Sequence, residues 1–126
     1  MSEDFNIEII RPDKSILSKK VDEAILPCFE GQVTILKDHI PLITFLRPGV
    51  LEVGKNDKYY VEEGTVEFFE NKLLILSSTV ISLKDIKSEQ INSMIQDAEE
   101  KINKKETTDK QKYVLSYKIS TLKQIN

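Results

Sequence analysis

Residues 30–51 read EGQVTILKDHIPLITFLRPGVL, and turn residues divide this stretch into short apolar runs. The runs cover residues 33–36 and 42–46, and a third run begins at residue 50 and continues to residue 53. Gly31 precedes the first run, and Pro48 and Gly49 separate the second from the third, since glycine and proline favour the backbone angles of turns. Short runs rich in Val, Ile, Leu and Phe are typical of β-strands. We expect Pro48 and Gly49 to form the centre of a type II turn, with a positive φ at Gly49.

The same pattern extends on both sides of this stretch. Phe5, Ile7 and Ile9 alternate with polar neighbours, as in a strand that is buried on one face. Further apolar runs bounded by turn residues cover residues 21–26, 59–61, 66–69 and 73–76. Many short strands at this spacing predict an antiparallel β-sandwich or barrel.

The pattern changes at Asp85, after which the sequence contains no glycine or proline. Apolar residues then recur at helical spacing in two groups, which are Ile91, Met94, Ile95, Ala98 and Ile102, and Leu115, Ile119, Leu122 and Ile125. We expect Asp85 or Ser88 to cap the first helix, and Thr108 with Gln111 to form a capping box at the second. The predicted fold is an all-β sandwich over residues 1–84 followed by a C-terminal antiparallel two-helix hairpin over residues 85–126.

Composition narrows the class of protein. With 126 residues, 40% hydrophobic and 31% charged, the chain is typical of a small globular protein. A net charge of −3 gives no basic excess for binding nucleic acid. The longest aliphatic run, residues 73–76, is far shorter than the roughly 20 residues of a membrane span. The first residues are acidic, unlike a signal peptide, so we expect the protein to stay in the compartment of its synthesis.

Residues able to carry catalysis are scarce. Cys28 is the only cysteine, which excludes an internal disulfide and a cysteine-based zinc site. Its neighbour Glu30 has the wrong charge to activate a thiol. His39 is the only histidine, and a single loop histidine is more often structural or interfacial than a general base. No glycine-rich phosphate loop is present. We therefore predict no catalytic, cofactor-binding or metal-binding residues.

The second helix carries a basic face of Lys110, Lys112, Lys118 and Lys123. Interleaved carboxylates argue against a nucleic acid or a membrane as its partner. Two interpretations stay open: solubilising charges opposite an apolar stripe, or a docking face with a regulatory role.

Residues 30–51 also resemble the signature of ATP synthase epsilon chains, in which Glu-Gly is followed by His-x-Pro-Leu and then Pro-Gly. Residues 21–27 and 60–68 are similar to the strands that flank this signature in the family, so the resemblance covers nearly the whole chain. One departure is Asp38, because the family often has glycine before the histidine. Cys28 replaces another frequent glycine.

The resemblance implies a sandwich of about ten strands with two C-terminal helices, and a non-catalytic role. Such a subunit lies in the central stalk of a proton-translocating F-type ATP synthase and rotates with it. It binds the gamma subunit and the c-ring, which couples proton flow to ATP synthesis. The expected location is the cytoplasmic face of a bacterial plasma membrane, reached only through the complex.

The resemblance also implies two contact regions. The loop expected to face the c-ring consists of Cys28, Phe29, Glu30, Gly31 and Gln32. The region expected at the rotor contacts with gamma consists of His39, Ile40, Pro41, Leu42, Ile43 and Thr44.

Two other functions remain as alternatives. The hairpin could act as a regulator that contacts the catalytic alpha and beta subunits and inhibits ATP hydrolysis, although the second helix is short.

Some family members bind ATP through an acidic residue and an arginine in the first helix. Here Lys87 and Gln90 occupy those positions, so we expect no ATP binding. The third possibility is an unrelated sandwich that binds a small ligand.

Overall fold

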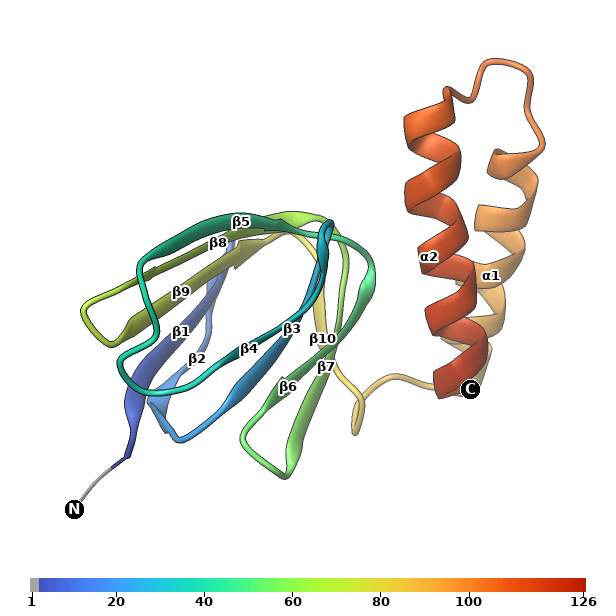
Figure 1. Ribbon diagram of the computed structural model, residues 1–126. Helices are drawn as coiled ribbons and strands as arrows, with labels where there is room; N and C mark the ends of the chain where they lie inside the picture. Colours follow the sequence, from blue (N-terminus) through green and yellow to red (C-terminus); the bar gives the residue numbers. More distant parts are fainter. Residues whose placement is uncertain (1–2) are drawn as a thin grey trace.

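The computed structural model describes residues 3–126, which form ten strands and two helices (Figure 1). The strands are β1 (Phe5–Arg11), β2 (Lys14–Val21), β3 (Ala24–Cys28), β4 (Gly31–Ile35), β5 (Leu42–Leu46), β6 (Gly49–Val53), β7 (Asp57–Val61), β8 (Gly64–Phe69), β9 (Lys72–Ser77) and β10 (Val80–Ser82). The helices are α1 (Ser88–Ile102) and α2 (Asp109–Ile125). Neither helix is long and apolar enough to cross a membrane.

The strands form one sheet that folds over itself into two layers. Its order is β10-β7-β6-β3-β5-β8-β9-β1-β2, with β4 added beside β3. The sheet bends at β3, because Ala24 pairs with β6 while Cys28 pairs with β5. All pairs are antiparallel except β1 with β9, which is parallel. The predicted fold class, a sandwich followed by a helical hairpin, is confirmed, with this one parallel pair as an exception.

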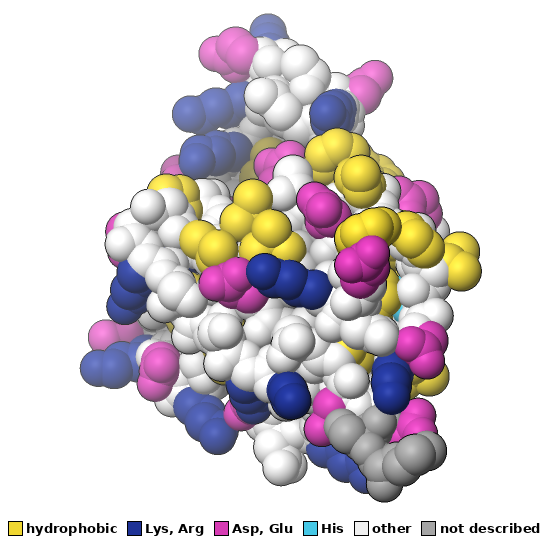
Figure 2. All heavy atoms as spheres, turned by 90° about the vertical axis from the view of Figure 1, so that its left-hand side faces the viewer, with side chains coloured by type: hydrophobic (Ala, Val, Ile, Leu, Met, Phe, Trp, Pro, Cys, Tyr) yellow, Lys and Arg dark blue, Asp and Glu magenta, His cyan; other side chains and the backbone are white. Residues whose placement is uncertain are grey.

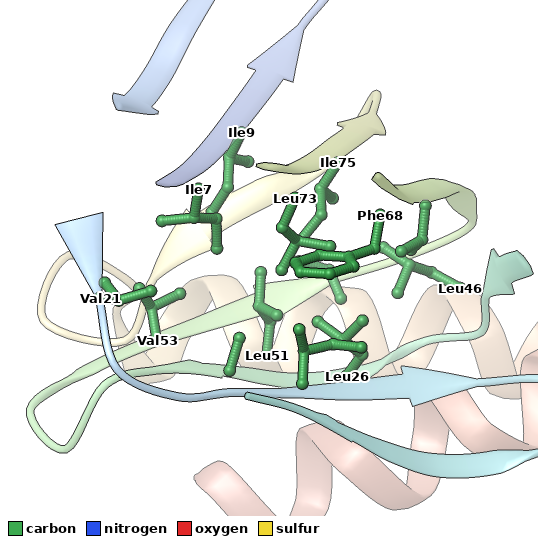
Figure 3. Packing of buried hydrophobic residues seen from close by; sticks show 14 of the residues in the cluster. Ile7, Ile9, Val21, Leu26, Leu46, Leu51, Val53, Phe68, Leu73 and Ile75 are labelled. Carbon is green, nitrogen blue, oxygen red and sulfur yellow. The ribbon is translucent and has the colours of Figure 1, made fainter. Parts of the chain in front are cut away.

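The core lies between the two layers (Figure 3). Every second residue of the strands that line the core points into it, because successive side chains of a strand point to opposite sides of the sheet. Ile7, Leu73 and Phe68 come from one layer and face Leu26 and Leu51 of the other, and each is at most 1% exposed. The alternation that was visible in residues 5–9 thus gives one continuous apolar cluster.

The helical hairpin packs on the sandwich through a second cluster. Ile91 of α1 and Leu122 of α2 are buried against Tyr60 of β7. The predicted capping box is confirmed: Gln111 N donates to Thr108 Oγ1 at 3.1 Å, and Thr108 N donates to Gln111 Oε1 at 2.8 Å.

The predicted cap of the first helix is wrong. The N-cap of α1 is Lys87, whose side chain makes no capping hydrogen bond, rather than Asp85 or Ser88. Asp85 instead lies in the turn after β10, where its N–H donates to the carbonyl of Ser82 at 2.9 Å. Burial of Ile91 and its neighbours therefore holds the start of this helix where a side-chain cap does not.

The predicted type II turn at Pro48-Gly49 is also wrong. Positive φ values among the described glycines occur at Gly31 and Gly54, not at Gly49, which begins β6 and pairs with Val61. The need for glycine there has another cause. A Cβ atom on Gly49 would lie 2.6 Å from Cβ of Pro27, a distance that side chains do not tolerate.

Candidate docking surfaces

The loop at residues 28–32 forms the tip of the β3–β4 hairpin, at the end of the sandwich beside the helices (Figure 1). Gly31 has a φ of 127°, a value that favours glycine and lets the chain reverse here. Glu30 and Gln32 are exposed, whereas Cys28 is fully buried. Only part of the predicted loop is therefore open to a partner.

Glu30 is held in place by strand β5. The Thr44 hydroxyl donates to the Glu30 carboxylate, with Oγ1 2.8 Å from Oε1 and 3.1 Å from Oε2. Phe29 N donates to the carbonyl oxygen of Phe45 at 3.1 Å. Since Thr44 is 3% exposed, it supports Glu30 from inside and offers no surface of its own. The two predicted contact regions meet at this hydrogen bond.

Cys28 should be chemically inert in the folded protein. Burial raises the pKa of its thiol to about 11, and the charge of Glu30 adds to this rise. Because of this raised pKa, almost none of the thiol is ionised at pH 8. The thiolate is the reactive form of cysteine, so the folded protein should react slowly. We expect Ellman's reagent to label Cys28 only after unfolding in urea. Rapid labelling of the native protein at pH 8 would contradict the burial of this thiol.

The region at residues 39–44 begins beyond the other end of β4, and Ile40, Pro41 and Ile43 are its exposed residues. Ile40 and Ile43 are 74% and 77% exposed. His39 instead packs edge-on against the core residue Phe68, with ring centroids 5.8 Å apart. Its Nδ1 lies 2.7 Å from the carbonyl oxygen of Ile40 and donates to it. His39 therefore supports this loop, while Ile40 and Ile43 face outward.

Large apolar side chains recur across three neighbouring strands, and one carboxylate, that of Glu67 of β8, lies beside Ile43 on the same side. We use the term apolar face for the exposed outer side of the sheet formed by Ile43, Phe45, Phe69 and Leu76. Phe45 of β5 pairs with Thr65 of β8, and Thr65 pairs with Leu76 of β9, so these side chains share one side of the sheet. Figure 2 shows hydrophobic side chains gathered on one face of the molecule between lysines and carboxylates.

Sequence reasoning missed three of these four residues, Phe45, Phe69 and Leu76. A signal for Phe45 is present in strand 42–46, where Thr44 interrupts an apolar run. Phe69 and Leu76 have no such local signal, because strand pairing alone brings them to this face. Successive side chains of a strand point to opposite sides of the sheet. A strand with apolar residues at successive positions is therefore either buried on both sides or exposes an apolar surface on one of them.

The four lysines of α2 do not form one face in the structure. Lys118 Nζ lies 3.0 Å from Glu62 Oε2 of the sandwich, and this pair is largely buried. Lys123 Nζ lies 3.5 Å from a carboxylate oxygen of α1. Lys110 borders a hollow beside the sandwich, and Lys112 is exposed. Lys118 therefore links α2 to the sandwich, whereas Lys123 links the two helices to each other.

Aromatic contacts strengthen the attachment of α2. Phe29 stacks on Tyr113 with ring centroids 6.0 Å apart, and the Arg47 guanidinium lies 4.1 Å from the centre of the Tyr117 ring. Tyr60 OH donates to Glu62 at 2.8 Å. Burial raises the pKa of Tyr60, and Glu62 raises it further, so this hydroxyl stays protonated as a donor. The hairpin thus covers one side of the loop at residues 28–32.

A hollow of about 540 Å³ between α2 and β6 has room for a small molecule. Its cationic groups already have partners, since Arg47 stacks on Tyr117 and Lys58 Nζ lies 3.8 Å from Glu52 Oε1. Among the described residues, no three His, Cys, Asp or Glu side chains gather as a metal site.

Comparison with known proteins identifies the family. A model of the β-sandwich domain of the ATP synthase delta/epsilon chain matches residues 4–83, which is more than half of the chain. The chain belongs to the ATP synthase delta/epsilon family. The epsilon chain of Pelagibacter ubique (strain HTCC1062) is 45% identical over 130 aligned residues that cover 100% of both proteins. That of Allorhizobium ampelinum is 28% identical and covers 76% of this chain and 74% of the relative.

Solved structures agree with this delta/epsilon fold. A chain of the Euglena gracilis mitochondrial ATP synthase, solved with OSCP, F1 and the c-ring, superposes with a TM-score of 0.81. It is 21% identical, and the match covers 98% of this chain and 82% of that chain. A chain from the central stalk and c-ring of the Tetrahymena thermophila mitochondrial enzyme gives a TM-score of 0.63 at 17% identity, covering 95% and 92%.

Membership in the delta/epsilon family confirms the resemblance found in the sequence. The chain is a non-catalytic subunit of ATP synthase and so part of a membrane-associated complex. The roles of the loop at residues 28–32, of residues 39–44 and of the four lysines stay predictions.

Proposed function

We propose that the chain joins the gamma subunit to the c-ring in the rotor of a proton-translocating F-type ATP synthase, on the cytoplasmic face of a bacterial plasma membrane. The apolar face carries this proposal, because a small rigid domain that exposes several large apolar side chains on one surface is built to bind another protein. The solved relatives come from assemblies that contain a central stalk or a c-ring.

The apolar face is the surface that fits gamma best. Ile43 and Phe45 lie two residues apart on the same side of β5, and Phe69 and Leu76 extend the surface over β8 and β9. Aromatic and aliphatic anchors of this kind supply most of the binding energy in protein interfaces. Because strands hold all four residues, little flexibility is lost on binding.

A tagged copy of the chain, purified from solubilised native membranes, tests the function as a whole. We expect the gamma, catalytic and c-ring subunits to purify with it, as identified by mass spectrometry. A folded tagged chain that brings none of these subunits would refute the rotor assignment.

The loop at residues 28–32 is the proposed contact with the c-ring, and Glu30 is its exposed charge. We expect Glu30→Lys to lower proton-driven ATP synthesis in membrane vesicles, because the contact then carries the opposite charge. Glu30→Gln is the matched control, since its amide oxygen still accepts from the Thr44 hydroxyl. It should retain more activity than Glu30→Lys. Normal synthesis by the Glu30→Lys complex would show that this charge makes no contact with the ring.

A further inference from the structure

The loop at residues 36–41, between β4 and β5, brings exposed apolar side chains to one end of the sandwich. Leu36 is 51% exposed and Ile40 is 74% exposed. The loop lies beside the turn between β8 and β9, because Leu42 at the start of β5 pairs with Phe68 near the end of β8. Ile40, two residues before Leu42, is therefore exposed close to the turn that follows Phe69.

Asp38 holds an unusual backbone conformation in this loop. Its φ is 65°, in the left-handed region that residues with a Cβ atom seldom adopt. Asparagine and aspartate enter this region more readily than most residues. A glycine would adopt this φ freely, but it would leave the loop more flexible.

A pair of hydrogen bonds fixes Asp38 to the β8–β9 turn. Asp38 N donates to Asn71 Oδ1 at 2.6 Å, and Asn71 Nδ2 donates to Asp38 Oδ1 at 2.9 Å. We call this pair the Asp38–Asn71 clasp. Asn71 is itself anchored, because its carbonyl oxygen accepts from Asn6 N of β1 at 2.9 Å. The loop is thus tied to a fixed part of the sheet by side chains 33 residues apart in sequence.

We propose that Asp38 and Asn71 are positioning residues, which hold Ile40 in line with the apolar face for binding of the gamma subunit. This inference rests on the proposed function. It assigns to Asp38 two tasks that glycine could not combine, since the aspartate tolerates the positive φ and also accepts a hydrogen bond. The clasp restricts the loop before the partner arrives, so less conformational entropy is lost on binding.

Asn71→Gly and a charge swap test this proposal in the full-length chain. Asn71 has a φ of 59°, which glycine adopts freely, so Asn71→Gly removes both clasp bonds and keeps the turn. Asn71→Asp places a second carboxylate against that of Asp38, where the two repel each other. The double variant Asp38→Asn/Asn71→Asp again pairs an amide donor with a carboxylate acceptor. The measurements are affinity for purified gamma subunit by calorimetry and thermal unfolding of each variant.

We expect Asn71→Gly and Asn71→Asp to bind gamma roughly three- to tenfold more weakly, with the double variant within about twofold of the parent. Unchanged affinity of the single variants would overturn the positioning role. So would a failure of the double variant to regain affinity, or a loss explained entirely by a smaller folded fraction. If the parent chain itself does not bind gamma, the proposed function fails, and this inference fails with it.

Discussion

Replacement of Phe68 by alanine is expected to lower the free energy of unfolding by about 3–5 kcal/mol. The Phe68 ring is 1% exposed and lies where the two layers of the sandwich meet (Figure 3). It packs edge-on against Phe5 and against His39, with ring centroids 5.7 Å and 5.8 Å away. The alanine variant loses the transfer energy of the ring and leaves a cavity that the rigid strands around it fill only in part. Urea unfolding followed by circular dichroism measures this loss.

The matched control for this change is the next residue in the chain. Phe69 points to the opposite side of β8 and is 54% exposed. Phe69→Ala should change the free energy of unfolding by no more than about 0.5 kcal/mol, as is usual for a surface site. If Phe68→Ala and Phe69→Ala lowered the free energy of unfolding by similar amounts, the side chains of β8 would not alternate between core and surface as described.

Strands with an apolar inner side could be predicted from the sequence, and two others could not. β2 reads KSILSKKV, and its two half-buried aliphatic residues, Ile16 and Leu17, are adjacent instead of alternating. It lies at the end of the sheet order, where polar residues on both sides are tolerated. β10 has only three residues and follows its partner β7 across an intervening β-hairpin. Neither strand has a local pattern, so pairing with a neighbour determines both.

Turn geometry was misjudged at Pro48-Gly49 for a related reason. The dipeptide has the composition of a type II turn, but the requirement for glycine comes from Pro27, which is far away in sequence. The Glu70-Asn71 turn shows the reverse case, because both residues have positive φ without any glycine. Composition gives the position of a turn, whereas long-range contacts determine its backbone angles.

The candidate site was only partly predictable because its residues come from separate strands. Ile40 and Ile43 lie inside the sequence signature and were named from it. Phe69 and Leu76 join them only through the pairing of β5 with β8 and of β8 with β9. Within β5, the sequence alone does not say whether Thr44 or its apolar neighbours face inward. In the structure Thr44 shares the inner side of β5 with Leu46, and its hydrogen bond to Glu30 satisfies the buried hydroxyl.

Introducing a charge into the apolar face should abolish most binding to the gamma subunit while leaving the fold intact. Ile43 and Phe45 are 77% and 57% exposed, so aspartate at either position remains hydrated in the free protein. In a complex the same carboxylate would be buried against apolar groups without a partner, and removal of a central anchor alone costs about 2 kcal/mol or more. We expect Phe45→Asp to weaken binding at least about 30-fold, and Ile43→Asp to have a similar effect.

The control for these variants is Thr34→Asp, which places the same residue at an exposed position of strand β4, outside the apolar face. All three variants carry an aspartate that is unfavourable in a strand, so they should lose similar, small amounts of stability. Calorimetric titration with gamma, together with urea unfolding, separates the two effects. Weak binding by Phe45→Asp beside full binding by Thr34→Asp would place the β5 part of the apolar face in the interface. Equal affinity for both would mean that gamma binds elsewhere, and the exposure of four large apolar side chains on one face would then need another partner to explain it.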